Sequence, residues 1–248
     1  MELIVVETHD LLASTAADLI CASIAVECDA PTVVPTGNTP VATYAELAKR
    51  RSEGLFDASR LRVFQLDDYL GISEDDPRSL YGWMRRSFLE PLGVPDEHVV
   101  RLRGDTADPD AVCREYDARV RLCGGLGLSI LGLGVNGHLG FNEPPADPRS
   151  PTRVVRLAPV SLESNSRYWG GMERVPREAL TAGMSVLLAA RRTLLLVAGA
   201  DKRDVLWQAM RGPITPEIPA SYLQRAPSVT VIADREAAPR LGSRGGVG

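Results

Sequence analysis

The stretch LSILGLGVNGHLGFNEPP, residues 128–145, decides the fold that we expect for this chain. Its first half is a continuous apolar run that ends in glycines, a pattern typical of a buried strand of a parallel sheet that runs into a loop. Its second half places Asn136, His138 and Glu143 within eight residues. Ligands of open α/β sheets bind at the carboxyl ends of strands, so these side chains are candidates for chemistry. The same local pattern also fits a glycine-rich turn with an ordinary hydrogen-bonded histidine.

The composition favours one α/β domain and argues against a nucleic-acid surface. The chain has 248 residues, 44% of them hydrophobic, which is enough for a full core. The net charge of -4 comes from interspersed charges, with no basic stripe to neutralise phosphates. The N-terminus lacks the features of a signal peptide, and Arg191 and Arg192 interrupt the apolar stretch 180–200, so we expect no membrane segment. The four cysteines show no metal-ligand spacing, which favours reduced thiols and a cytoplasmic protein.

Apolar runs alternate with helical patterns along the whole chain. This alternation predicts a single-domain, Rossmann-like, doubly wound fold over residues 1–248, with a mainly parallel sheet and helices on both faces. A glycine-rich segment makes 158–178 a candidate lid, and 240–248 is expected to be a flexible tail. Besides the run that begins at Leu128, strands are expected at 3–6, 31–35, 61–66, 97–102, 152–157, 192–199 and 228–233, and helices at 10–25, after Pro40, and at 78–89, 108–122, 161–169 and after Asp201.

The loop PTGNTP, residues 35–40, is predicted to bind an anion. It joins a strand to a helix, with Thr39 suited to the N-cap and Pro40 to the first helical position. Gly37 lets the backbone approach a phosphate, and the hydroxyl groups of Thr36 and Thr39 add donors. An ordinary capped turn is the alternative, because most helix N-termini bind only water. The loop has neither GxGxxG nor GxxxxGK[ST], so it indicates neither a dinucleotide nor a P-loop nucleotide.

Two adjacent acids, Asp67 and Asp68, follow the predicted strand 61–66. Neighbouring side chains of an extended segment point in opposite directions, so one acid can face a pocket while the other is held structurally. A desolvated carboxyl group beside another has a raised pKa, which suits it to accept a proton from carbon. An ordinary turn and helix-cap signal is the alternative. Lys202 sits against the dipole of a predicted helix unless it meets an anion, whereas Arg167 is equally compatible with a surface salt bridge.

Several motifs in this order resemble those of the glucosamine-6-phosphate deaminase (isomerase) family, which is related in fold to the 6-phosphogluconolactonases. They are PTGNTP at 35–40, LDDY at 66–69, GHLGFNEP at 137–144, NSRYW at 165–169, VPREALTAGM at 175–184 and GADK at 199–202. The resemblance implies an enzyme, classed as a hydrolase of an amino sugar phosphate, that converts glucosamine 6-phosphate and water to fructose 6-phosphate and ammonia. It implies neither a metal nor another cofactor.

The resemblance also implies roles for the candidate residues. Asp67 would move a proton between C2 and C1 of the sugar, and His138 would open the pyranose ring while Glu143 orients it. Asn136 stands where many members of the family have Asp, and an amide can orient His138 but cannot hold an imidazolium by charge. The residues implied in phosphate binding are Thr36, Gly37, Asn38, Thr39, Arg167 and Lys202.

Other readings stay open at this point. The substrate can be another amino sugar phosphate, such as galactosamine 6-phosphate, or the chain can be a lactonase or a non-catalytic sugar-phosphate sensor. Ala146 and Val155 occupy positions where allosteric relatives carry Ser and Lys, so we expect no activation by N-acetylglucosamine 6-phosphate. A small amino sugar phosphate is the expected partner, and the chain is expected to be a monomer or a homo-oligomer.

Overall fold

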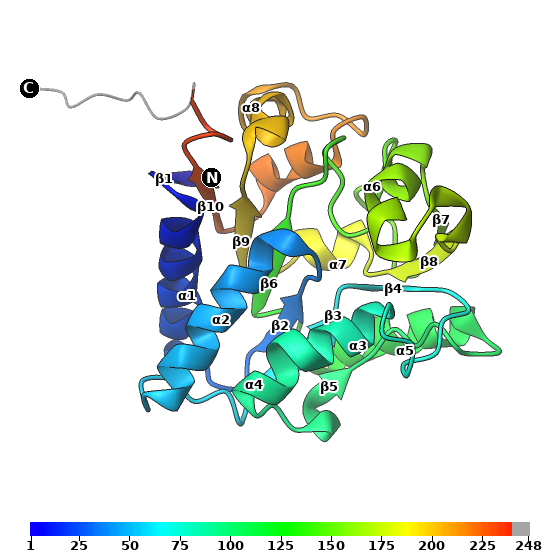
Figure 1. Ribbon diagram of the computed structural model, residues 1–248, viewed down its shortest axis with the longest axis horizontal. Helices are drawn as coiled ribbons and strands as arrows, with labels where there is room; N and C mark the ends of the chain where they lie inside the picture. The colour runs from blue at the N-terminus through cyan, green and yellow to red at the C-terminus, as the bar shows by residue number, and fades with distance from the viewer. Residues whose placement is uncertain (240–248) are drawn as a thin grey trace, which may run out of the picture.

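A seven-stranded parallel sheet forms the centre of the protein, in the order β1-β10-β9-β6-β2-β3-β5 (Figure 1). The computed structural model describes residues 1–239. Each hydrogen-bonded pair in this sheet is parallel. The strands are β1 (Glu2–Val6), β2 (Pro31–Val34), β3 (Arg62–Gln65), β5 (Val99–Val100), β6 (Leu128–Gly132), β9 (Arg192–Val197) and β10 (Val229–Asp234).

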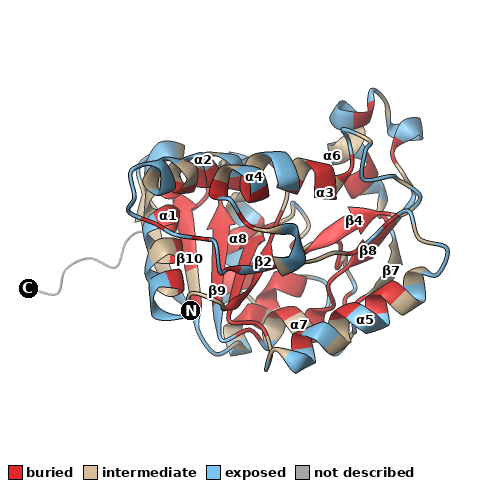
Figure 2. Cartoon of the chain, turned by 90° about the horizontal axis from the view of Figure 1, so that it is seen from below, coloured by how far each residue is buried: buried red, intermediate tan, exposed pale blue. Residues whose placement is uncertain are grey.

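Helices cover both faces of the sheet (Figure 2). Alternate strand residues point to opposite faces: Val34 and Ile130 belong to the core under α1, α2 and the helical turns after α3, whereas Val33 and Leu131 belong to the core under α5, α7 and α8. Both cores are buried, which explains the continuous apolar runs of the strands. The helices are α1 (His9–Val26), α2 (Asn38–Ser52), α3 (Leu80–Met84), α4 (Glu90–Leu92), α5 (Pro109–Leu122), α6 (Pro159–Trp169), α7 (Met184–Leu188) and α8 (Arg203–Arg211).

Single turns of other helix types complete the chain. A π-helical turn, Arg85–Leu89, joins α3 to α4, so the predicted helix at 78–89 is less regular than its pattern indicated. Tyr81, Met84 and Phe88 are buried in the core, as expected for its apolar face. The remaining turns are 3-10 helices at Asp96–His98, Met172–Arg174, Ala200–Lys202 and Pro219–Arg225.

A second, three-stranded antiparallel sheet lies beside the carboxyl ends of the first. Its order is β4 (Asp67–Tyr69), β8 (Glu178–Thr181) and β7 (Arg153–Arg156). It packs with α6 around a small separate core that contains Tyr69, Phe141 and Trp169. In Figure 1, α6 and this sheet form the lobe at the right of the parallel sheet.

The chain reverses its direction of winding between β2 and β6. From β2 the sheet continues through β3 and β5 toward one edge, and from β6 it continues through β9 and β10 toward the other. The loops that leave β2 and β6 therefore diverge and open a crevice at the carboxyl ends of these neighbouring strands. Figure 1 shows both loops leaving the sheet toward α6.

The predicted fold class is confirmed, with three differences in detail. Asp67 and Asp68 do not end β3 but belong to β4 in the second sheet, and β8 was not predicted. The predicted Thr39 N-cap is wrong, because α2 begins at Asn38 after Gly37, whose φ of 113° turns the chain into the helix earlier. Pro40 is therefore the third helical residue. The predicted tail, 240–248, lies outside the described residues.

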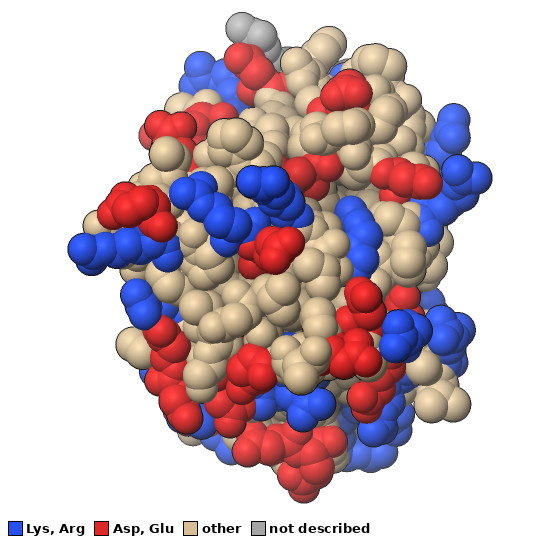
Figure 3. Space-filling view, turned by 90° about the vertical axis from the view of Figure 1, so that its right-hand side faces the viewer, with Lys and Arg blue, Asp and Glu red and all other residues tan. Residues whose placement is uncertain are grey.

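Helix α1 passes a length and composition test for a membrane span, with a mean hydropathy of 1.3. Its apolar face is used inside the fold: Leu12, Ala16 and Ile20 are fully buried in the core beneath the sheet. A core helix passes the same test, and this packing accounts for the hydropathy of α1. All four cysteines are free, as expected. Figure 3 shows positive and negative side chains mixed over the face that contains the second sheet, in line with the interspersed charges of the sequence.

Candidate active site

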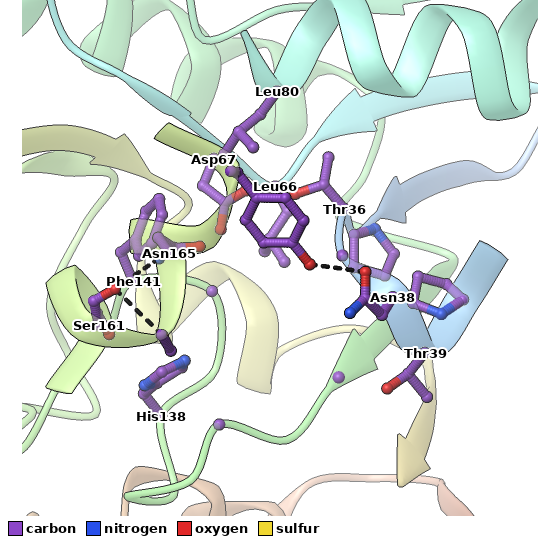
Figure 4. A pocket seen from close by; sticks show the side chains of 18 of the residues that line it. Thr36, Asn38, Thr39, Leu66, Asp67, Leu80, His138, Phe141, Ser161 and Asn165 are labelled. Atoms are coloured by element: carbon purple, nitrogen blue, oxygen red, sulfur yellow. Dashed lines mark hydrogen bonds between the residues drawn. The ribbon is translucent and has the colours of Figure 1, made fainter. Parts of the chain in front are cut away.

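A cavity of about 560 Å³ opens at the crevice between the loops of β2 and β6. Its volume lies in the range of pockets for small ligands. Asp67 and His138 both line it, together with the loop of residues 36–39 and two cationic side chains from other elements, Arg167 and Lys202. In Figure 4, Asp67 lies above the hollow, His138 below it, and the loop with Thr36, Asn38 and Thr39 on one side.

The two neighbouring acids have different environments. Asp68 accepts hydrogen bonds from the backbone N–H groups of Tyr69, Leu80 and Tyr81, at 2.9, 3.0 and 3.2 Å, and so caps the first turn of α3. Asp67 is only 5% exposed, and its Oδ1 has no hydrogen-bond partner in the described chain. Burial, followed by the charge of Asp68, raises the pKa of Asp67 to about 8, against a smaller opposing effect of the Thr36 hydroxyl group. Asp67 is thus a carboxyl group that can exchange a proton near neutral pH.

Gln65 fixes the turn that carries these acids into the second sheet. Its side-chain amide donates to the backbone carbonyl of Asp67 at 2.9 Å and to the carboxylate of Asp68 at 2.8 Å. Its Oε1 accepts from the N–H of Leu102 at 3.0 Å. Gln65 is fully buried, so all three bonds are shielded from water. Gln65 was not predicted as a site residue, since a glutamine at the end of a strand carries no distinctive pattern.

A chain of hydrogen bonds holds His138 from behind. Its Nδ1 lies 2.7 Å from Oδ1 of Asn136, and Nδ2 of Asn136 donates to Oε2 of Glu143 at 2.8 Å. Because Asn136 offers an oxygen, Nδ1 carries the proton and Nε2 of the neutral ring is left as an acceptor. Oε2 of Glu143 is also 3.5 Å from Nδ1, so this carboxylate faces the ring directly as well as through the amide. Burial opposes the ionisation of Glu143, but His138, Ser161 and Asn136 outweigh it and lower its pKa to about 2.

The backbone around this chain is shaped to fit it. A Cβ atom on Gly134 would collide with the imidazole ring of His138, so only glycine lets the ring lie against this turn. The buried side chain of Asn142 donates to the carbonyl groups of Leu139 and Ala182, both at 2.9 Å, and accepts from Arg153 at 2.8 Å. These bonds tie the loop before Glu143 to β7 and to the end of β8.

The opposite side of the cavity suits an anion. Helix α2 starts at Asn38 without a side-chain cap, so N–H groups of its first turn are free to meet a ligand at the positive end of the helix dipole. A Cβ atom on Gly37 would meet nothing within 4 Å. Lys202 is 3.3 Å from Asp201, with 17% of its side chain exposed, and Arg167 has no carboxylate partner within the described residues. The alternative reading of Arg167, a surface salt bridge, is therefore not met within that part of the chain.

The structure brings eight of the ten predicted residues to the cavity wall: Thr36, Gly37, Asn38, Thr39, Asp67, His138, Arg167 and Lys202. Asn136 and Glu143 lie behind His138 and act through it. Sequence reasoning missed Ser161 and Tyr168, which line the same cavity from α6. Neither residue type is distinctive by itself, although Tyr168 belongs to the NSRYW motif.

A family model for "glucosamine-6-phosphate isomerases/6-phosphogluconolactonase" matches residues 7–232. The chain belongs to this family. A glucosamine-6-phosphate deaminase of Corynebacterium aurimucosum is 40% identical over 98% of this chain and 95% of its own length. One from Clostridium botulinum is 34% identical over 97% of this chain and 99% of its own length.

Solved structures in the family agree with the fold. A monomeric glucosamine-6-phosphate deaminase is 33% identical and superposes with a TM-score of 0.93, over 96% of this chain and 98% of its own. The 6-phosphogluconolactonase of Leishmania guyanensis superposes with a TM-score of 0.78 at 20% identity, over 98% and 99% of the two chains, which supports the shared fold only. The comparisons favour the terms deaminase and isomerase over the hydrolase class expected from the sequence.

The contact between Gly134 and His138 can be tested by substitution. In Gly134→Ala the new methyl group displaces the imidazole ring, so the side-chain NMR signals of His138 should shift by more than those of His9 and His98. Gly132→Ala is the matched control, because a Cβ atom there meets nothing within 4 Å. Equal shifts of His138 in the two variants would contradict the proposed steric role of Gly134.

The raised pKa of Asp67 predicts a specific pH dependence of stability. Between pH 5 and pH 8 the unfolded chain has released this proton while the folded chain still binds it, so the free energy of unfolding falls as the pH rises. At about 1.4 kcal/mol per pH unit, wild type should lose roughly 4 kcal/mol relative to Asp67→Asn across this window. Urea unfolding at both pH values measures the difference.

The control for this measurement is Asp57→Asn. Asp57 is exposed, and the hydrogen bonds from Ser59 lower its pKa, so it titrates below the window. This variant should follow the wild-type slope. A wild-type slope equal to that of Asp67→Asn would mean that Asp67 is already ionised in the folded protein at pH 5.

Proposed function

We propose that this protein deaminates and isomerises glucosamine 6-phosphate to fructose 6-phosphate and ammonia. The observation that carries the proposal is the convergence of Asp67 and His138 on one cavity bordered by the anion-binding loop 36–39. The close similarity to glucosamine-6-phosphate deaminases over nearly the full length supports the same activity. A phosphorylated sugar fits this arrangement, since it needs an anion site at one end and proton-transfer groups at the other.

The phosphate group is assigned to the positive end of α2. Backbone N–H groups of Gly37, Asn38 and Thr39 would donate to its oxygens, and the Arg167 and Lys202 side chains would compensate its charge. The hydroxyl group of Thr36 also contacts the carboxyl group of Asp67. We therefore assign Thr36 to both ends of the site, where it links phosphate binding to the position of the base.

Ring opening is assigned to His138. The free Nε2 of its neutral ring can accept the proton of the C1 hydroxyl group and return a proton to the ring oxygen, which yields the open-chain aldehyde. The imidazolium that forms between these steps is held by the Asn136 oxygen and, through that amide, by the ionised Glu143. Asn136 is thus the direct positioning partner of His138, and Glu143 supplies the negative charge behind it.

The proton shift is assigned to Asp67. Its ionised form accepts the proton from C2 of the open-chain 2-amino aldehyde, and the same carboxyl group returns that proton to C1. A proton of the amino group passes to the aldehyde oxygen, so the product of this shift is the C2 imine of the ketose. Water then adds at C2 and ammonia leaves, so the sum is sugar phosphate plus water to ketose phosphate plus ammonia. The buried environment of Asp67 makes its conjugate acid stable at neutral pH, which is what a base that must hold a proton temporarily requires.

We assign the reaction to the cytoplasm and to a single chain. The described cysteines are free thiols, which suits a reducing compartment. A 33% identical deaminase is described as monomeric, which supports a site formed by one chain. The segment 158–178 contains α6 with Arg167 and remains the candidate lid.

The assay that tests the function measures ammonia and ketose phosphate from glucosamine 6-phosphate and, separately, from galactosamine 6-phosphate. We expect turnover of the first, and in Asp67→Asn we expect kcat to fall by about 100-fold to 10,000-fold because proton transfer to a positioned base is lost. Asp57→Asn, a distant exposed carboxylate, serves as the control. Preferred turnover of the galactosamine epimer would reassign the substrate, and binding without ammonia release would favour a sensor.

The pH dependence of the rate follows from the same carboxyl group. Only ionised Asp67 accepts the C2 proton, and its pKa is raised to about 8. Below that pH, kcat/KM for glucosamine 6-phosphate should rise about tenfold per pH unit and then level off. A profile that is already level at pH 6 would argue against Asp67 as the base, or against its raised pKa in the free protein.

A further inference from the structure

A hydrogen bond joins two distant segments at the rim of the cavity. The hydroxyl group of Tyr168, in the last turn of α6, donates to Oδ1 of Asn38 at 2.6 Å, across 130 residues of sequence (Figure 4). Both residues line the cavity, and Tyr168 is 46% exposed. The assignments above give Tyr168 no role.

This bond decides how the Asn38 amide faces the cavity. The hydroxyl group donates to Oδ1 of Asn38, so the bond holds the amide at the rim with its oxygen toward Tyr168 and its Nδ2 group directed elsewhere. The Nδ2 group of Asn38 makes no hydrogen bond to another described residue. Asn38 is also the first residue of α2, where the helix dipole is positive. Its two N–H donors are therefore available at the place assigned to the phosphate.

The ring of Tyr168 also contacts a cationic group of the same site. The guanidinium carbon of Arg167 lies 4.8 Å from the centre of this ring, in a cation–π contact. Adjacent residues of a helix do not normally face each other, so the contact requires the arginine side chain to fold along the rim toward its neighbour. Tyr168 thus touches two of the groups that are assigned to phosphate binding, one from α2 and one from α6.

We propose that Tyr168 is a positioning residue of the phosphate site, which orients the Asn38 amide with its hydroxyl group and the Arg167 guanidinium with its ring. This inference rests on the proposed function for the identity of the ligand. Donors that are already oriented lose less freedom when the anion binds, so the pair raises affinity for the phosphate end of a sugar phosphate.

The test measures fructose 6-phosphate binding by calorimetry, which needs no turnover. Tyr168→Phe keeps the ring and loses the hydroxyl group, so its Kd should rise by about threefold to tenfold, as for one hydrogen bond. Asn38→Gly should have a similar effect, and the double variant should bind no worse than the weaker single variant. Tyr222→Phe, a tyrosine outside the cavity, is the matched control and should bind as wild type.

A further variant distinguishes two roles of the Asn38 side chain, which are donation from its N–H groups to the phosphate and acceptance of the Tyr168 hydroxyl proton. Asn38→Asp keeps an acceptor for Tyr168 but replaces the N–H donors with a negative charge, so it should bind fructose 6-phosphate more weakly than Asn38→Gly. Wild-type affinity in Asn38→Asp would mean that only the bridge matters and would overturn the proposal. Additive losses in the Tyr168→Phe and Asn38→Gly pair would overturn it as well.

Enzyme kinetics distinguish this inference from the proposed function. With glucosamine 6-phosphate, Tyr168→Phe should raise KM by more than it lowers kcat, because the phosphate lies away from the reacting carbons. If wild type releases no ammonia but the binding results hold, the function fails and the inference stands. If ammonia is released and Tyr168→Phe changes neither Kd nor KM, the inference fails and the function stands.

Discussion

The parallel pairing of β2 with β6 is the constraint on which the site depends. Thr32 pairs with Leu128 and Val33 with Ser129, which makes neighbours of two strands that are separated by nearly a hundred residues. The order of winding reverses between these two strands. The loop 36–39 and the loop that carries His138 therefore leave the sheet as neighbours and then turn in opposite directions. A shift in this register would move one loop along the other and separate the anion-binding end from the imidazole. The apolar residues of β2 and β6, buried on both faces, are what specify it.

The second sheet and the residues around it hold the carboxyl group of Asp67, whose Oδ1 has no hydrogen-bond partner in the described chain. An isolated buried carboxylate is costly, and the cost is accepted only where neighbouring bonds hold the group in place. Asp68 supplies those bonds by capping α3, and Gln65 locks the turn between β3 and β4. Register pairing of Asp67 with Thr181 in β8 fixes its backbone from the other side. The start of α3, the turn after β3 and strand β8 thus hold the backbone around Asp67 in place, although Oδ1 of Asp67 itself has no hydrogen-bond partner in the described chain.

Much of this arrangement was predictable from the sequence because it follows from local pattern. The apolar run from Leu128 to Gly132 predicts a buried strand, and the residues after Gly37 predict the start of a helix. The acid pair that begins at Asp67 marks a candidate site. Their convergence also followed, because carboxyl ends of parallel strands meet at one edge. The residues that were missed act over long distances: β8 pairs with β4 across more than a hundred residues, and Tyr168 reaches Asn38 across 130. No local period marks a strand of four residues or a single hydrogen-bonding hydroxyl group. The start of α2 was misplaced for a related reason, since the positive φ of Gly37 overrode the preferences of Thr39 and Pro40.

The charged groups near His138 and Asp67 differ in sign and position. Glu143 is ionised, with a pKa lowered to about 2, yet it stands behind a neutral amide and not in contact with the ligand space. In the proposed mechanism, its charge would stabilise a transient imidazolium without placing an anion besides Asp68 next to Asp67, which would raise the pKa of Asp67 still further. The cationic groups proposed to bind the phosphate come from α6 and from the turn after β9, and neither is among the groups that shift the pKa of Asp67. A direct cation beside Asp67 would lower its pKa and weaken it as a base. In the proposed function, this distribution of charges would allow one small site to bind an anion and to move protons at neutral pH.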